Sequence, residues 1–441
     1  MKKKVCVVGL GYIGLPTAIV AANADFDVVG FDIDQKKVER INNFDPVIEE
    51  PELSEKLREA LSSGNFRAIQ AIEAADFFVI AVPTPFLENK EADLSYIWHA
   101  AASIATVLKK GDVVILESTV PVRATDKLGE RLEMLTPLKA GVDFFVAHCP
   151  ERVLPGKIFH ELVHNARIIG GINQESVEQA KLFYKAFVKG ALYLTNATTA
   201  EMVKLVENSS RDVEIAFANQ VAAMAYKIGL NPFEVIELAN KHPRVNILNP
   251  SCGVGGHCIA VDPWFLVQTF PEETKLLKMA RDVNSAKPRQ VVQATRYCIE
   301  RWRQAHQKVA NVLILGLTYK PDIDDLRESP ALEIAKKLSI FTDMNLLICD
   351  PYIHNENIVE IFGHDGVSLQ KGIEQADIIL CLVKHTAFKK IDALDIQHKK
   401  ILDFCGIFYE PHKEQDTQEK LFWPASNAAI RSIIDHMQGE I

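Results

Sequence analysis

Short apolar runs alternate with amphipathic stretches along the first 150 residues. The apolar runs are VCVVGL at 5–10, DVVGFD at 27–32, FFVIAV at 77–82, DVVILES at 112–118 and DFFVAHC at 143–149. Such unbroken apolar runs predict strands that are buried on both faces. Helical periodicity lies between them, around 12–24, 35–43, 52–62 and 95–109. Strands that alternate with helices predict a parallel sheet covered on both faces, which is a Rossmann-like doubly wound α/β domain.

The pattern changes at about residue 198. Residues 198–229, TTAEMVKLVENSSRDVEIAFANQVAAMAYKIG, contain no proline and no internal glycine, so they predict an unusually long helix. Helical periodicity continues over 232–241 and from about 273 to 304. A long helix of this kind serves either as a dimerisation spine or as an intramolecular strut, and we favour dimerisation.

Strand rhythm then returns in the last third of the chain. Its apolar runs are ANVLILGL at 310–317, NLLICD at 345–350, DIILCLV at 377–383 and KILDF at 400–404. They predict a second, smaller doubly wound unit, without an obvious sequence repeat of the first. We therefore expect two Rossmann-like domains, 1–197 and 306–441, joined by a central helical region at 198–305.

Length and composition narrow the class of protein. A chain of 441 residues exceeds the size of one core, and its net charge of −9 argues against a nucleic-acid binder. No apolar run reaches the ~18 residues of a membrane span, and glycines and Pro16 interrupt the apolar start. Eight scattered cysteines favour reduced, mostly buried thiols, so we expect a cytoplasmic protein without membrane contact.

The first motif is GLGYIG at 9–14, between the first predicted strand and helix. Gly9 permits a tight turn, Gly11 lets the backbone approach a pyrophosphate, and Gly14 allows close helix–strand packing. The helix N-terminus supplies amide donors to the phosphates. Asp32 ends the second strand, 21 residues after Gly11, where an acid accepts hydrogen bonds from a ribose diol and repels a 2′-phosphate. These features predict an NAD site.

Two further strands each lead into a Thr followed closely by Pro, in AVPTP at 81–85 and ESTVP at 117–121. The carboxyl edge of such sheets binds ligands, so Thr84 and Thr119 are candidate cofactor contacts. Their hydroxyls are nearly as well explained as caps of the following loops.

A polar stripe runs along the long predicted helix. Lys204, Asn208 and Arg211 stand at i, i+4 and i+7 and so share one face. A buried lysine there could hold an oxyanion or transfer protons. By itself the stripe is better explained as a solvated face, with Glu207 pairing with Lys204 or Arg211.

The most unusual segment is GVGGHCIAVDPWF at 253–265. A metal site would need more soft ligands than Cys252, His257 and Cys258, so we expect none. Cys258 is either an inert thiol or a nucleophile. The nucleophile hypothesis rests on the flanking glycines, on Asp262 as a base, and on a nearby cation such as Lys204 that lowers the pKa of the thiol.

Together and in this order, the motifs resemble the UDP-glucose/GDP-mannose dehydrogenase family over nearly the whole chain. AEMVKLVEN, CPERVLPG, GLTYKPDIDDLRESPA and the Cys258 segment carry the resemblance. Several of them look most like the branch that oxidises UDP-N-acetyl-D-mannosamine for bacterial surface polysaccharide. The resemblance implies a four-electron oxidation of the sugar C6 alcohol by two NAD+, through a thiohemiacetal and a thioester on Cys258.

The resemblance also implies roles for individual residues. Lys204 and Asn208 would hold the oxyanion, Asp262 would activate water or the alcohol, and Glu151 would assist thioester hydrolysis. Tyr12, Ile13 and Arg327 would join Asp32, Thr84 and Thr119 around NAD. The UDP-sugar would contact Arg152, Val153, Lys204, Asn208, Arg211, His242, Arg244, Gly255, Tyr319 and Lys320. Arg244 would reach the neighbouring subunit's site, which implies a homodimer.

Two positions depart from the family pattern. Ser251-Cys252 replaces the usual glycine and proline before the Cys258 segment, and Cys405 stands where relatives often carry a basic nucleotide contact. Three other functions remain as rivals. A family member that oxidises UDP-N-acetyl-D-glucosamine would differ only in the C2 configuration of its substrate. A two-electron β-hydroxyacid dehydrogenase would lack the cysteine segment and the second nucleotide domain. A silent nucleotide-sugar sensor would not need Lys204, Cys258 and Asp262 together.

Overall fold

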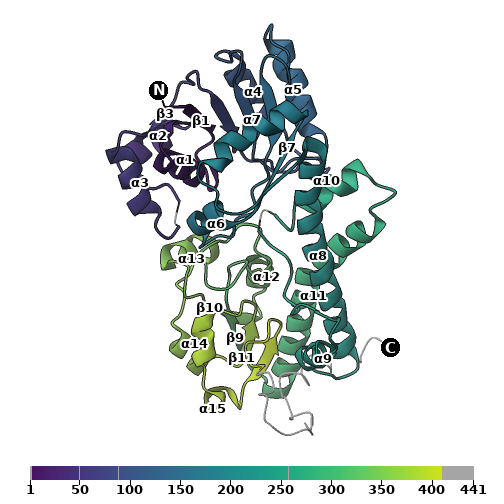
Figure 1. The fold of residues 1–441 in the computed structure, drawn as a ribbon. Helices are drawn as coiled ribbons and strands as arrows, with labels where there is room; N and C mark the ends of the chain where they lie inside the picture. Colours follow the sequence, from purple (N-terminus) through teal and green to yellow (C-terminus); the bar gives the residue numbers. More distant parts are fainter. Residues whose placement is uncertain (1, 49, 88, 257, 410–441) are drawn as a thin grey trace, which may run out of the picture. The chain divides into compact units, whose positions relative to one another are not determined.

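The computed structural model describes residues 2–48, 50–87, 89–256 and 258–409 (Figure 1). The chain forms two compact units. The first unit comprises Met1–Glu207 and Trp264–Glu273, and the second comprises Asn208–Pro263 and Thr274–Ile441. Among the residues described, no helix is both long enough and apolar enough to cross a membrane.

The first unit is built on an eight-stranded sheet in the order β3-β2-β1-β4-β5-β6-β7-β8. All neighbouring pairs are parallel except β6 and β7, so the expectation of a purely parallel sheet is corrected at this pair. The strands are β1 (Lys4–Val8), β2 (Asp27–Phe31), β3 (Phe66–Ile69), β4 (Phe77–Ile80), β5 (Val113–Leu116), β6 (Phe145–His148), β7 (Arg167–Gly171) and β8 (Leu192–Asn196).

Three of these strands, β3, β7 and β8, were not predicted from the sequence. β3 and β8 are the edge strands, and both expose part of their side chains. An edge strand needs no continuous apolar run, because one of its sides has no neighbouring strand. The hydrophobic pattern therefore identified β1, β2, β4, β5 and β6, and it missed both edge strands and the interior strand β7.

Helices cover both faces of this sheet. Val5 and Val7 of β1 join one apolar cluster with α1, α6 and α7, while Cys6 and Val8 join another with α4 and α5. The helices of this unit are α1 (Gly14–Asn23), α2 (Gln35–Asn42), α3 (Leu53–Ser62), α4 (Ser95–Ala105), α5 (Ala124–Leu135), α6 (Ile158–His164) and α7 (Gln174–Lys185).

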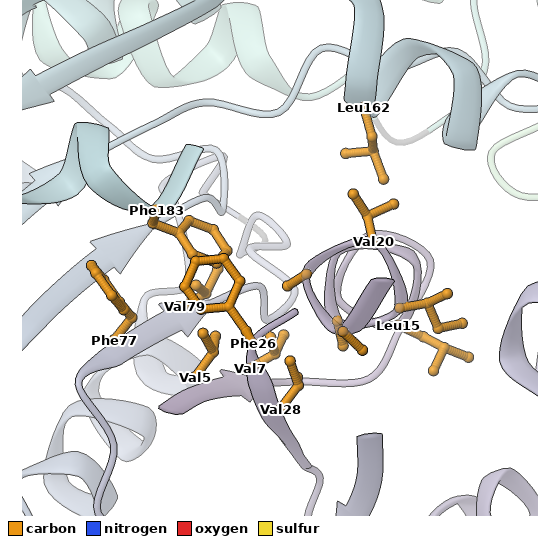
Figure 2. Close-up of a cluster of buried hydrophobic side chains, with 14 of the residues drawn as sticks. Val5, Val7, Leu15, Val20, Phe26, Val28, Phe77, Val79, Leu162 and Phe183 are labelled. Atoms are coloured by element: carbon orange, nitrogen blue, oxygen red, sulfur yellow. The ribbon is translucent and has the colours of Figure 1, made fainter. Parts of the chain in front are cut away.

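The core of the first unit is dense where α1, α6 and α7 meet the sheet. Figure 2 shows Phe183 pointing toward Phe26 and Val79, and Val20 toward Leu162. The rings of Phe26 and Phe183 are 5.5 Å apart between centroids, which is the spacing of a favourable aromatic pair. This packing holds α1, and with it the glycine turn before α1, against the sheet.

The second unit contains a four-stranded sheet, all parallel, in the order β10-β9-β11-β12. Its strands are β9 (Ala310–Leu315), β10 (Met344–Cys349), β11 (Ile378–Cys381) and β12 (Lys400–Asp403). Its other elements are α9 (Pro232–Ala239), α11 (Lys275–His306), α12 (Pro330–Ser339), α13 (Asn355–Phe362), α14 (Leu369–Gln375), the 3-10 helix η1 (Thr386–Lys390) and α15 (Ala393–Ile396).

Two helices belong partly to each unit. They are α8 (Ala197–Lys227), with 31 residues, and the short α10 (Asp262–Thr269). The fold class predicted from the sequence, two Rossmann-like α/β sheets with a long central helix, is confirmed. The boundaries at 197 and 305 stay predictions, and the tail beyond residue 409 lies outside the described part of the chain.

Candidate active site

The glycine turn of the first unit is shaped by steric limits. A Cβ on Gly14 would lie 1.8 Å from the carbonyl oxygen of Gly9, and Gly9 has a φ of +95°. A side chain is therefore excluded at Gly14 and strained at Gly9. At Gly11, in contrast, a Cβ would meet no atom within 4 Å, so the backbone there faces open space. The N-cap residue of α1, Ile13, provides no side-chain acceptor for the first-turn amides, which suits a phosphate.

Asp32 stands beside this turn as a buried carboxylate. Its Oδ2 accepts from the Leu10 amide at 2.9 Å and from Lys37 Nζ at 2.8 Å, and its Oδ1 accepts from the Asp34 amide at 3.0 Å. Each oxygen has two lone pairs, so Oδ1 can accept a further bond from a ribose hydroxyl. Lys37 was missed in the sequence, where it is one of several exposed-looking lysines.

The second unit contains a similar glycine turn, but its backbone does not face open space. Gly316 has a φ of +93°, and Asp350 Oδ2 accepts from the Leu317 amide at 2.6 Å. However, buried Thr318 replaces Gly11, and buried His385 lies 3.3 Å from Asp350 Oδ2. Within the described residues, the geometry that fits a dinucleotide is that of the first unit.

Thr84 and Thr119 are brought together at the carboxyl edge of the first sheet. The Thr84 hydroxyl donates to the Thr119 carbonyl oxygen at 2.7 Å. Thr84 thus ties two loops together, as the capping alternative anticipated, and it stands at the edge where the cofactor hypothesis requires it.

Tyr12 connects the glycine turn to the segment that contains residues 151–153. Its hydroxyl donates to Glu50 Oε2 at 3.0 Å, and Glu50 accepts from the amides of Gly156 and Ile158, each at 2.9 Å. The sequence carries no local signal for Glu50, because its contacts with Gly156 and Ile158 join chain segments more than 100 residues apart.

Glu151 and Arg152 are held by buried or half-buried ion pairs. Glu151 Oε2 accepts from Arg167 Nη1 at 2.8 Å, and its Oε1 accepts from the Arg152 amide at 2.6 Å. Arg152 Nη1 pairs with Glu207 at 2.7 Å, so the expected pairing of Glu207 with Lys204 or Arg211 is wrong. The expectation considered neighbours along one helix, whereas the pair joins that helix to a loop. Val153 packs against the core of the first unit.

Lys204 is buried on α8, near the end of β6. Burial lowers the pKa of His148 to about 3, and the Lys204 charge acts in the same direction. His148 is therefore neutral beside the Lys204 ammonium. The predicted polar stripe divides along the helix, because Lys204 is buried, Asn208 is half-buried, and Arg211 is exposed with Glu214 at 3.4 Å.

One helical turn after Lys204, Asn208 contacts the end of the cysteine segment. Its Nδ2 donates to Asp262 Oδ2 at 2.5 Å, and the Asp262 amide donates to the Cys258 carbonyl oxygen at 2.9 Å. Asp262 is buried at the start of α10, whereas Cys258 is exposed. An exposed thiol beside a buried carboxylate and an amide is an arrangement for nucleophilic and acid–base chemistry.

The cysteine segment is seated on residues 317–330 of the same unit. A Cβ on Gly255 would lie 2.4 Å from the Glu328 carbonyl oxygen, and the Gly256 amide donates to the Arg327 carbonyl at 3.2 Å. Burial raises the pKa of Tyr319, with Asp325 and Cys258 adding to the shift. The structure thus brings Tyr319 and the backbone of Arg327 to the segment that contains Gly255 and Cys258.

Two basic side chains, those of Arg327 and Lys320, belong to the stretch that contacts the cysteine segment. Arg327 makes a two-pronged contact with Asp325, at 2.9 Å from Nε to Oδ1 and 2.6 Å from Nη2 to Oδ2. Lys320 is half-buried, and its carbonyl accepts from the Thr318 hydroxyl at 2.9 Å. The side chains of Arg327 and Lys320 are thus candidates to bind an anionic ligand.

A buried hydrogen-bond network that the sequence did not reveal holds the backbone of the cysteine segment at Ile259. Arg281 Nη1 of α11 donates to Asp212 Oδ1 of α8 at 2.9 Å and to the Ile259 carbonyl at 3.1 Å. Asn284 donates to the same Asp212 oxygen at 2.8 Å. Charged residues inside long amphipathic helices look like surface positions until the helices are packed together.

The cysteines differ in environment. Cys252 is buried, donates to the Leu382 carbonyl at 3.5 Å, and has its pKa raised by burial to about 12. Cys405 is half-buried against Asp403. His257 lies outside the described residues, and the described ones contain no group of three or more potential metal ligands.

His242 and Arg244 are exposed on a loop that Asn240 closes through two bonds to Ile247, at 2.9 and 2.7 Å. Within the described chain, neither side chain bonds to the cysteine segment. Their predicted contacts with the sugar nucleotide therefore stay predictions.

Three models of one protein family match successive parts of this chain. Models of the UDP-glucose/GDP-mannose dehydrogenase family match residues 3–188 as the NAD binding domain, 198–286 as the central domain and 313–410 as the UDP binding domain. The chain is 46% identical to an NDP-N-acetyl-D-galactosaminuronic acid dehydrogenase of Ralstonia nicotianae, over 92% of this chain and 96% of that protein.

Two further relatives carry another name. The UDP-N-acetyl-D-mannosamine dehydrogenase of Campylobacter jejuni is 46% identical, over 91% of this chain and 99% of that protein. The solved structure of a UDP-D-ManNAc dehydrogenase from Pyrococcus horikoshii has a TM-score of 0.84 at 42% identity, covering 92% of this chain and 96% of that one.

Proposed function

Because this chain belongs to the UDP-glucose/GDP-mannose dehydrogenase family and is an NAD-dependent nucleotide-sugar dehydrogenase, we propose that it oxidises UDP-N-acetyl-D-mannosamine at C6. The product is UDP-N-acetyl-D-mannosaminuronate, and each sugar consumes two NAD+. The observation that carries the proposal is the exposed Cys258 beside buried Asp262, which Asn208 holds one turn after Lys204.

In the first stage the C6 alcohol becomes an aldehyde. NAD+ bound at the glycine turn supplies the hydride acceptor for each of the two oxidations. Asp262 receives the hydroxyl proton as the hydride leaves C6. The Cys258 thiolate then adds to the aldehyde carbon, giving a thiohemiacetal whose oxyanion is held by the Lys204 ammonium and the second Nδ2 hydrogen of Asn208.

In the second stage the thiohemiacetal carbon loses a hydride and its oxygen loses any proton, leaving a thioester. Glu151 takes a proton from the attacking water, and the tetrahedral intermediate collapses with Cys258 leaving as thiolate. The sum is one alcohol and one water converted to a carboxylate, with two hydrides transferred and three protons released.

The proposed contacts of the two ligands are those that the family resemblance implies. NAD contacts Gly9, Gly11, Tyr12, Ile13, Gly14, Asp32, Thr84, Thr119 and Arg327. The UDP-sugar contacts Arg152, Val153, Lys204, Asn208, Arg211, His242, Arg244, Gly255, Tyr319 and Lys320. Cations and amide donors in this second set suit a diphosphate in an otherwise acidic chain.

The sugar is the part of the proposal that needs a direct test, because relatives of equal identity carry two names. The N-acetylgalactosamine nucleotide is therefore a second candidate. UDP-ManNAc, UDP-GlcNAc, UDP-GalNAc, UDP-glucose and GDP-mannose should be compared by kcat/KM and by NADH formed per sugar. We expect the highest kcat/KM and two NADH per sugar with UDP-ManNAc. A higher kcat/KM for UDP-GalNAc would replace the proposed substrate, and one NADH per sugar would contradict the thioester route.

The same assay identifies the nucleophile. Cys258→Ser should stop the reaction before the acid is released, whereas the matched variant Cys252→Ser should remain active because that thiol is buried and protonated. If Cys252→Ser lost activity and Cys258→Ser kept it, the nucleophile would be Cys252 and not Cys258.

We propose that the protein forms a homodimer along α8. The exposed apolar side chains Met202, Val206, Phe217 and Met224 fall within an arc of about 60° at 100° per residue. Lys204, Asn208 and Arg211 lie on the opposite side of the helix by the same count. A second copy would cover the apolar stripe and leave the polar face for the substrate, and Arg244 would enter the partner's site. We place the enzyme in the cytoplasm, where its product would feed surface polysaccharide.

A further inference from the structure

One buried cation lies among buried acids in the first unit. Arg167 begins β7, Glu117 directly follows β5, and Glu151 closely follows β6. Because β7 runs antiparallel to β6, its start lies at the edge where β5 and β6 end. Glu117 is 1% exposed, Arg167 3% and Glu151 8%, so water screens none of the three charges effectively.

The hydrogen bonds of Arg167 do not commit it fully to one acid. Its Nη1 donates to Glu151 Oε2 at 2.8 Å, and its guanidinium lies 5.6 Å from the centre of the Tyr184 ring. Its Nε and Nη2 are buried and donate to no described residue. The positive charge therefore acts on both neighbouring carboxyl groups through a medium of low dielectric constant.

Glu117 is bonded to neutral partners. The Tyr184 hydroxyl donates to Oε1 at 2.8 Å, and the Thr17 hydroxyl of α1 donates to Oε2 at 3.3 Å. Cys149 also faces this cluster, and burial raises its pKa to about 12, while burial raises the pKa of Tyr184 well above its usual range. Both groups are thus neutral near pH 7.

Charge balance in the cluster then depends on Glu117. Two ionised carboxylates with one guanidinium would leave a net buried negative charge, which is costly. Burial raises the pKa of Glu117 to about 7, with Arg167 opposing the shift and Glu151 adding to it. Glu117 therefore changes charge near neutral pH.

We propose that Glu117 is a positioning residue that sets the basicity of Glu151 through the shared Arg167. The inference rests on the proposed function, in which Glu151 takes the proton from the water that attacks the thioester. When Glu117 is protonated, the charge of Arg167 acts on Glu151 alone and weakens it as a base. When Glu117 ionises, it shares Arg167 and adds a negative charge, so Glu151 becomes a stronger base.

The test is the pH profile of thioester hydrolysis, measured in single turnovers by quenching and following the acyl-enzyme. In the unmodified enzyme the rate should rise about threefold to tenfold between pH 6 and 8, with a midpoint near 7. Glu117→Gln should stay at the low-pH rate and lose the midpoint, while aldehyde formation still proceeds.

Two further variants separate this effect from a structural one. Tyr184→Phe removes a bond that favours ionised Glu117, so the midpoint should move to higher pH. Asp112→Asn is the matched control, because Asp112 is a buried carboxyl at the opposite end of β5 whose pKa burial raises to about 6. It should leave the midpoint unchanged.

The outcomes distinguish the inference from the function on which it rests. A midpoint that persists in Glu117→Gln, or does not move in Tyr184→Phe, overturns the role of Glu117. If Glu117→Gln does not fold, Tyr184→Phe decides alone. Absence of any acyl-enzyme, with one NADH per sugar in the unmodified enzyme, instead overturns the thioester mechanism.

Discussion

Lys287 illustrates how a single residue can be costly to the fold. It lies on α11 with 5% of its surface exposed, close to the buried Cys252. Burial lowers its pKa from 10.5 to about 8, against the opposing effect of Cys252. An ammonium group is therefore maintained inside the second unit at neutral pH, where desolvation disfavours it.

We predict that Lys287→Met stabilises the second unit at pH 7 by about 1–3 kcal/mol, because a shift of this size corresponds to roughly 3 kcal/mol. The folded state binds fewer protons than the unfolded state between pH 8 and 10.5. The unmodified protein should therefore gain stability relative to the variant as pH rises through that window, and the difference should be constant below it. Urea unfolding of both proteins at pH 7, 9 and 10.5 measures this.

A pH-independent difference between the two proteins would show that Lys287 keeps its ordinary pKa. Lys287→Arg is the matched control, because guanidinium does not titrate in this range and should remove the pH dependence without relieving the burial cost.

At the scale of elements, α8 and α11 are joined by a buried ion pair. Arg281 and Asp212 are both nearly inaccessible, and burial lowers the pKa of Arg281 while it raises that of Asp212. The environment thus disfavours the charge on each partner. Such a pair orients its elements and adds little net stability compared with apolar residues of similar size.

We expect Asp212→Ala to destabilise the second unit by about 3–5 kcal/mol, because it leaves the Arg281 charge buried without its carboxylate. The double variant Asp212→Leu/Arg281→Met should recover most of this loss, as measured by chemical denaturation in a double-mutant cycle. It should still have reduced activity, since the bond from Arg281 to the Ile259 carbonyl is removed. A double variant as unstable as the single one would mean that the pair is itself strongly stabilising.

At the scale of the whole molecule, the exposed apolar stripe on α8 is the surface on which the proposed dimer rests. Phe217 is 52% exposed and Met224 60%, on a helix whose opposite side carries Lys204 and Asn208. Large apolar side chains exposed in a row along one helix are a costly surface for a monomer. The proposed interface therefore lies on the same helix as Lys204 and Asn208.

We predict that Phe217→Glu converts a dimer to a monomer and lowers kcat/KM at least tenfold, since each site would lose the partner's Arg244. Sedimentation or light scattering gives the mass, and the NADH assay gives the activity. Met134→Glu is the matched control, because Met134 is an exposed apolar residue of a different helix, α5. A dimer that persists in Phe217→Glu would place the interface elsewhere.

Much of the fold was predictable because buried parallel strands carry unbroken apolar runs. Every predicted apolar run from VCVVGL to KILDF corresponds to a strand, and residues 198–229 correspond closely to α8. The edge strands β3 and β8 were not predictable in this way, since partial exposure weakens the hydrophobic pattern. The reversal at β7 was equally invisible, because strand direction depends on the path of the connecting chain.

The sequence by itself determined the two sheets, the glycine turn with Asp32, the dehydrogenase family and the polar residues placed together on α8. These follow from local rules: steric limits at glycine, helical periodicity and short motifs. Only the tertiary structure decided that Cys252 is buried while Cys258 is exposed, that Glu207 pairs with Arg152, and that Arg167 lies among Glu117, Glu151 and Tyr184. Burial and ion pairing depend on contacts between segments distant in the chain, and no local pattern encodes which segments meet.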